Sequence, residues 1–167
     1  MIYNDPYKND YDHRPVKDEK GRFKDEFYYT GERTELGLDE AQKKKASRRK
    51  LLTAVVLLAA TVLPGLPEHP ASRVLWVTLP WVICFLPAGF FLMGAVEYAS
   101  NGLALSRREY DHSVKRMHRS TVGLLILGVL NMILAAVYTV LHFDVTELLY
   151  IASFIPVTGI CFLRRKE

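Results

Sequence analysis

Apolar residues gather in four runs that follow a polar N-terminal segment. An apolar helix of about 20 residues is long enough to cross a bilayer. The first and fourth runs are short for this, and Pro156 and Gly159 interrupt the fourth, so that run also fits a re-entrant or interfacial segment. The pattern predicts an all-α fold, an integral membrane bundle of four transmembrane spans. The predicted spans are residues 51–66, 74–98, 121–142 and 148–163.

Local signals indicate where the helices begin and bend. Asp39 and Glu40 each precede a lysine by four residues, which is the stabilising order of charges on a helix. Because no Gly or Pro follows until Pro64, one helix should run from Asp39 into the first span. The second span can bend at Pro80 and Pro87. Residues 39–167 therefore form the predicted membrane domain.

The segment 1–38 has the composition of a chain that cannot bury a core. Its first 33 residues show no apolar periodicity and are rich in charged residues, Asn and Pro, so we expect a disordered or weakly structured, flexible tail. Its aromatic content is unusual for a solvated tail and favours docking on the membrane domain or on a partner, while a solvated tail without a role is equally compatible. The aromatic residues are Tyr3, Tyr7, Tyr11, Phe23, Phe27, Tyr28 and Tyr29.

Basic residues predict how the chain is oriented. The net charge is +4, and Lys and Arg gather before the first span, in the segment 100–119 and at the C-terminus. The 67–73 loop has only Arg73, and the 143–147 loop has none. Cytoplasmic loops carry the excess of Lys and Arg, so both termini should be cytoplasmic in a multi-pass protein of the cell membrane. Basic residues beside apolar spans indicate anionic inner-leaflet lipid as a partner, rather than nucleic acid.

The basic inner loop 100–119 begins at an Asn101-Gly102 turn signal. Apolar residues recur among its basic ones, which favours a short amphipathic helix on the inner leaflet. The alternative is that these basic residues only set the orientation of the chain in the membrane. Glu97 precedes this loop and is the only carboxylate in a predicted span. We expect it to pair with Arg107 or Arg108, and a cation or proton site is the alternative.

One face of the third span carries small and polar residues. Small residues let helix backbones approach, and a buried Asn can hydrogen-bond to a neighbouring helix. Helix packing is therefore the preferred interpretation, and a ligand-binding Asn is the alternative. With Leu124, this face consists of Gly128, Asn131, Ala135 and Thr139.

Two predicted outer loops carry imidazole and carboxylate groups, which are ligands for zinc or manganese. No pair is spaced to present two ligands from one helix, so we interpret these residues as ordinary polar loop residues and predict no metal site. They are Glu68, His69, His142, Asp144 and Glu147.

Motifs for nucleotide binding, metalloprotease or serine hydrolase chemistry are absent from the sequence. We therefore predict no enzyme and no cofactor. The preferred function is a non-catalytic accessory subunit or scaffold that acts through helix and tail contacts, by self-association or with another membrane protein. The alternative is a small oligomeric transporter or channel, since short kinked spans can assemble around a shared pathway.

Overall fold

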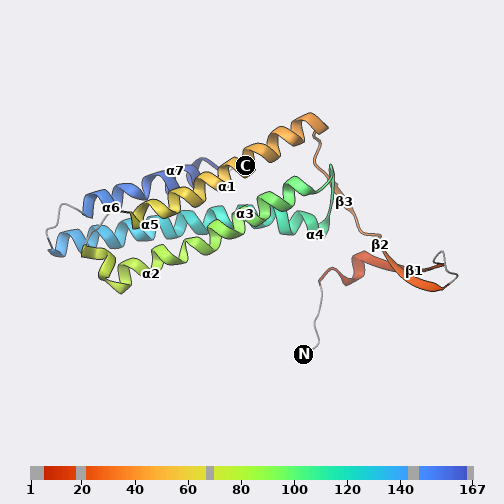
Figure 1. The fold of residues 1–167 in the computed structure, drawn as a ribbon, viewed down its shortest axis with the longest axis horizontal. Coiled ribbons are helices and arrows are strands. Elements are labelled where there is room, and N and C mark those ends of the chain that lie inside the picture. The colour runs from red at the N-terminus through yellow and green to blue at the C-terminus, as the bar shows by residue number, and fades with distance from the viewer. Residues whose placement is uncertain (1–5, 18–21, 67–69, 143–146, 165–167) are drawn as a thin grey trace, which may run out of the picture.

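The computed structural model describes residues 6–17, 22–66, 70–142 and 147–164. The described chain forms an elongated helical bundle, from one end of which a β-hairpin projects (Figure 1). Four helical stretches build the bundle, and each corresponds to one of the four apolar runs. The predicted helical body is therefore present.

The first helix, α1 (Glu40–Val62), is continuous, as the sequence predicts. Its start is capped because the Asp39 backbone N–H donates to the Gln42 side chain at 3.3 Å. Lys and Arg occupy its first half and apolar residues its second half. A 3₁₀ turn, Leu63–Gly65, ends this stretch where Pro64 interrupts the helical hydrogen bonding.

A turn at Cys84 divides the second stretch into α2 (Leu75–Ile83) and α3 (Phe85–Ser100). The break lies just before Pro87, which has no N–H to offer the carbonyl of Ile83 and would clash with it in a regular helix. A 3₁₀ turn, Pro70–Arg73, precedes α2. An interruption of the helix is therefore present near Pro87, whereas Pro80 lies inside α2.

The third stretch corrects the prediction for the basic loop. It comprises α4 (Arg107–Tyr110), a π-helical turn (Asp111–Lys115) and α5 (Arg116–His142), which follow one another without a break. The reason is local, because Glu109 N–H donates to Ser106 Oγ at 3.3 Å and Ser106 N–H donates to the Glu109 carboxylate at 2.7 Å. This capping box starts a helix at Arg107. The basic segment thus extends the third helix and is not a separate interfacial helix.

The fourth stretch consists of α6 (Glu147–Ser153) and α7 (Ile155–Arg164). Phe154 separates them, and Pro156 follows two residues later. Since Pro156 lacks an N–H, the helix cannot continue its regular hydrogen bonds through this point.

The helices form a four-membered ring in which α1 packs on α3, α3 on α5, α5 on α7 and α7 on α1 (Figure 1). Helix α5 also contacts α2 and α6. One apolar core cluster, which includes Leu57, Phe91 and Leu124, joins all four sides of the ring. A second cluster, which includes Val77, Tyr138 and Phe154, joins α2, α5 and the α6–α7 stretch.

Two of the helical stretches are long and apolar enough to cross a membrane, namely Leu75–Ser100 and Arg107–His142. Leu148–Arg164 is apolar but shorter. Large apolar side chains also point outward from the ring, for example Val55 on α1, Ile126 on α5 and Leu163 on α7. Soluble proteins seldom expose such extended apolar surface.

The N-terminal segment corrects the all-α prediction. Strands β1 (Tyr11–Lys17) and β2 (Phe23–Tyr29) pair antiparallel, with Tyr11 opposite Tyr29. Cross-strand aromatic contacts stabilise this hairpin, because the Tyr11 and Tyr29 rings meet edge to face at 5.4 Å and the His13 and Phe27 rings lie 6.2 Å apart. Such pairs depend on partners that helical periodicity does not reveal.

A second small sheet joins the N-terminal segment to the bundle. Strand β3 (Arg33–Glu35) pairs antiparallel with β4 (Ala104–Ser106), which lies in the turn between α3 and α4. Gly37 then adopts a left-handed conformation (φ 61°) that favours glycine and redirects the chain toward α1. The part of the segment predicted to be disordered or weakly structured thus contains three strands.

Candidate functional site

The N-terminal segment meets the bundle at the end that carries most of the described Lys and Arg residues of the bundle. We call this the basic end, and it comprises the first half of α1, the last turn of α3, α4, the π-helical turn and the start of α5. Its basic residues are Lys43, Lys44, Lys45, Arg48, Arg49, Lys50, Arg107, Arg108, Lys115, Arg116 and Arg119.

Tyrosine hydroxyls fasten the N-terminal segment to the basic end. Arg107 N–H donates to Tyr29 Oη at 3.0 Å, and Tyr29 Oη donates to the Glu32 carbonyl at 2.8 Å. Tyr7 Oη donates to the Asp111 carboxylate at 3.1 Å, although the two residues lie 104 positions apart in the chain. These contacts add to the β3–β4 pairing and hold the hairpin beside α4.

Charge neutralisation accompanies the contact between Tyr7 and Asp111. Lys115 Nζ lies 2.5 Å from the Asp111 carboxylate. Burial raises the pKa of Asp111, but the hydrogen bonds from Lys115 and Tyr7 outweigh this, so the pKa lies below its ordinary value. Burial and the neighbouring carboxylate raise the pKa of Tyr7. The pair is therefore ionised carboxylate and neutral phenol over a wide pH range.

Lys43 ties α1 to the turn that follows α3. Its side chain is only 7% exposed, and its ammonium group donates to the carbonyls of Asn101 and Gly102. It also lies over the ring of Tyr98, 5.6 Å from the centroid. Burial lowers the pKa of Lys43, and nearby Glu109 opposes this effect. The lysine therefore replaces its lost hydration with two carbonyl oxygens and an aromatic face.

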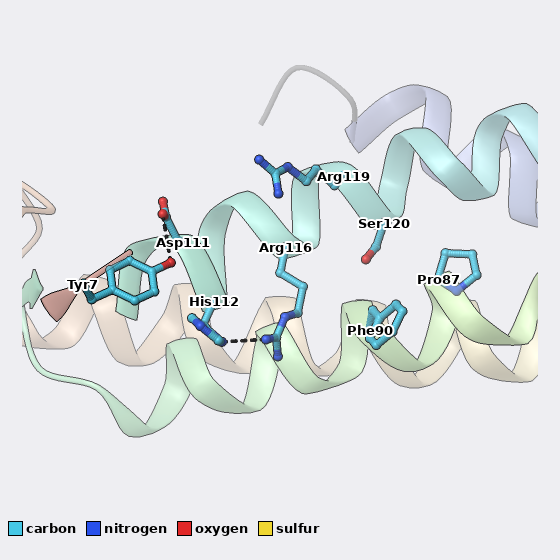
Figure 2. A pocket seen from close by; sticks show the side chains of 8 residues that line it. All are labelled: Tyr7, Pro87, Phe90, Asp111, His112, Arg116, Arg119 and Ser120. Atoms are coloured by element: carbon cyan, nitrogen blue, oxygen red, sulfur yellow. Dashed lines mark hydrogen bonds between the residues drawn. The ribbon is translucent and has the colours of Figure 1, made fainter. Parts of the chain in front are cut away.

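An open pocket of about 430 Å³ lies beside Tyr7, between α3 and the start of α5 (Figure 2). One side of the pocket is polar and basic, and the other side is apolar. The lining residues are Tyr7, Pro87, Phe90, Asp111, His112, Arg116, Arg119 and Ser120.

Within the pocket, Arg116 is held in place by its neighbours. Its Nη2 lies 2.6 Å from His112 Nδ1, and its Nη1 lies 3.7 Å from the Glu97 carboxylate. A guanidinium is always a donor, so Nδ1 of His112 must accept and the ring proton must be on Nε2. The Arg119 side chain is exposed and has no hydrogen-bond or ion-pair partner among the described residues.

Glu97 pairs with a different arginine from those we expected. Gly94 of α3 lies against Ser113 and Met117, which brings Arg116 level with Glu97. Arg107 lies nine residues before Arg116, which is about two and a half helical turns nearer the start of the third stretch. The register of the two antiparallel helices therefore selects Arg116.

The structure places the predicted face of the third span against other helices. Gly128 and Ala135 are buried, and a Cβ added at Gly128 would lie 2.5 Å from Thr158 Cγ2 of α7. Asn131 is fully buried, and its amide N–H₂ donates to the Leu127 carbonyl at 2.8 Å, while its Oδ1 has no partner among the described atoms. Thr139 Oγ1 donates to the Ala135 carbonyl at 2.9 Å.

The residues weighed as metal ligands are only partly within the described chain. Glu68, His69 and Asp144 lie outside it, as does the side chain of Glu147. His142 stacks on the ring of Tyr138 at 4.1 Å. Among the described residues no group of three or more His, Cys, Asp or Glu side chains could hold a metal ion.

Sequence reasoning missed most of the residues that gather at the basic end. The density of aromatic residues was compatible both with docking of the N-terminal segment and with a solvated tail, and it did not indicate a docking position. Nothing in the local sequence distinguishes Lys43 from its exposed neighbours or marks Asp111 as the partner of Tyr7. Comparison of the chain with known protein families, curated proteins and solved structures finds no match.

Proposed function

We propose that the chain crosses the cell membrane four times, with both termini in the cytoplasm. The asymmetry of Lys and Arg supports this orientation, since the basic residues gather at one end of the bundle. The outward apolar faces of α1 and α7 support two further spans beside the two long ones. The apolar second half of α1 and the α6–α7 stretch are short, and their packing against α3 and α5 would cover the polar backbone groups at their ends.

We further propose a non-catalytic role, in which the chain is an accessory subunit or scaffold that presents its hairpin at the cytoplasmic surface. The observation that carries this proposal is the docking of the N-terminal segment on the basic end through Tyr7, Tyr29 and the β3–β4 pairing. These contacts hold a hairpin beside the bundle, where a partner in or near the membrane can reach it.

The surface of the hairpin supports an interaction role. Phe23 and Phe27 are each 72% exposed and lie on the same face of β2. A hairpin of two strands is marginally stable in water by itself. The outer edge of β2 contains no proline, so a further strand could pair with it. The proposed partner is a second copy of the chain or another membrane protein.

Photo-crosslinking in cells tests this role. A benzophenone amino acid in place of Phe27 should give a discrete adduct with a second copy or with another membrane protein. The matched control is the same amino acid in place of Lys45, which is exposed on α1 at the same end of the bundle. Equal adducts from both positions, or none from position 27, would contradict the proposal.

Reconstitution distinguishes the rival function. Purified chain in proteoliposomes should move neither ions nor small solutes across the bilayer. Specific flux, together with the absence of an adduct at position 27, would favour an oligomeric transporter or channel instead.

A further inference from the structure

The pocket beside Tyr7 carries an excess of positive charge. Arg116 and Arg119 are three residues apart on α5 and therefore lie on neighbouring positions of one helix surface. The carboxylate of Asp111 is already neutralised by Lys115 at 2.5 Å and bonded to Tyr7. Glu97 offsets part of the charge on Arg116 at 3.7 Å. Arg119 has no such partner among the described residues, so the pocket attracts an anion.

The opposite wall of the pocket is apolar. Pro87 and Phe90 of α3 form it, and Phe90 is 51% exposed. The outward surface of α3 continues with exposed Leu86 and Met93. Ser120, which is almost fully buried, lies between the apolar wall and the arginines (Figure 2). A ligand that fits both walls has an anionic group joined to an apolar group.

We propose that this pocket binds the phosphate group of an anionic phospholipid from the cytoplasmic leaflet. Arg116 and Arg119 contact the phosphate, because the planar guanidinium matches phosphate oxygens in pairs. The acyl chains lie along Pro87 and Phe90 toward the bilayer. Basic pockets between membrane helices on the cytoplasmic side are suited to such headgroups. The assignment to this leaflet rests on the proposed orientation, whereas the lipid chemistry rests on the pocket.

A soluble phosphate compound shares the anionic chemistry but not the apolar part. It would gain nothing from the exposed ring of Phe90, and an open pocket would leave it in contact with water. The two-walled pocket therefore favours a lipid.

Native mass spectrometry of the full chain, released from micelles that contain phosphatidylglycerol or phosphatidylcholine, tests the proposal. The wild-type chain should retain phosphatidylglycerol in preference to phosphatidylcholine. Arg119→Gln should weaken this retention at least about fivefold, and Arg116→Gln should do the same. Lys45→Gln is the matched control, because it removes the same charge from the basic end outside this pocket and should leave retention unchanged.

Two further measurements distinguish a bound phospholipid from a bound soluble phosphate. Phe90→Ser should reduce lipid retention, whereas Leu79→Ser, at an exposed apolar position of α2, should not. Millimolar inorganic phosphate should not displace the lipid. Displacement by phosphate, or equal loss of retention in Lys45→Gln and Arg119→Gln, would overturn the lipid site.

Arg119 contacts no other described side chain through a polar group, so Arg119→Gln should fold like the wild-type chain. The melting temperature of each variant checks that it is folded. If only the pocket variants lose the preference for phosphatidylglycerol, the lipid site is supported, even when the crosslinker at position 27 gives no adduct. Conversely, an adduct at position 27 with unselective lipid binding removes this inference and leaves the proposed function intact.

Discussion

Replacement of Gly128 by alanine tests the close approach of α5 to α7. The added Cβ would lie 2.5 Å from Thr158 Cγ2, whereas carbon atoms pack at about 3.5–4.0 Å. Thr158 cannot turn away freely, because its hydroxyl donates to the Phe154 carbonyl at 2.9 Å and lies 3.1 Å from that of Ile155. Relief therefore requires that the helices separate by about 1 Å or that the hydroxyl contacts are lost.

The magnitude follows from two opposing effects. Overpacking of this kind costs about 1–3 kcal/mol, while exchange of Gly for Ala in a helix returns about 1 kcal/mol. Gly123→Ala is the matched control on the same helix, because its added Cβ would meet Pro87 Cβ at an ordinary 3.6 Å. It should be neutral or slightly stabilising. The difference between the two variants should be about 2 kcal/mol, or roughly 5 °C in melting temperature.

Thermal unfolding in detergent, followed by the fraction of monomer that survives heating, measures this difference. Thr158→Ser removes the Cγ2 methyl and keeps the hydroxyl, so the double variant Gly128→Ala/Thr158→Ser should recover most of the lost stability. Equal melting temperatures for Gly128→Ala and Gly123→Ala would refute the reasoning, and so would a double variant without recovery.

Four further predictions concern the basic end and the orientation of the chain. In a cysteine-free background, a cysteine in place of Pro70 should react with an impermeant thiol reagent outside intact cells, and one in place of His112 should not; labelling at 112 would reverse the proposed topology. Tyr7→Phe should lower the population of the docked hairpin by about 0.5–1.5 kcal/mol, as measured by distances between spin labels on β2 and α1; unchanged distances would remove this contact from the docking. In the same assay, docking of the wild-type chain should persist between pH 3.8 and pH 10.0, the ordinary pKa values of Asp111 and Tyr7. The reason is that docking lowers the pKa of Asp111 and raises the pKa of Tyr7. Docking should weaken as the pH falls below 3.8, where Asp111 becomes protonated, or rises above 10.0, where Tyr7 becomes ionised. Glu97→Gln should change stability by less than about 1 kcal/mol, since its ion pair is partly exposed and long at 3.7 Å; a larger loss would assign it a role beyond the ion pair.

The sequence predicts which residues share the packing face of α5, and the structure shows what these residues contact. The sequence groups Gly128, Asn131 and Ala135 on one helix face because the helical period is local. The structure adds that Gly128 faces Thr158 and that Asn131 lies 3.7 Å from the sulfur of Cys84. Since a hydrogen bond between membrane helices averages about 0.6 kcal/mol, Asn131→Leu should disturb packing less than Gly128→Leu.

Local sequence signals predict the helical body of the chain. Helix starts and breaks depend on residues within a few positions, such as Asp39 before α1 and Pro156 within the fourth stretch. Apolar runs of sufficient length likewise identify the helical stretches without reference to their neighbours. These features are local, so the sequence alone carries them.

The contacts between distant residues at the basic end depend on tertiary packing. Tyr7 and Asp111 are 104 positions apart, and β3 finds its partner strand in the turn after α3. The partner of Glu97 depends on the register of two antiparallel helices, which packing around Gly94 sets. Such contacts depend on how the elements fit together in space, and neither helical period nor residue spacing along the chain encodes that fit.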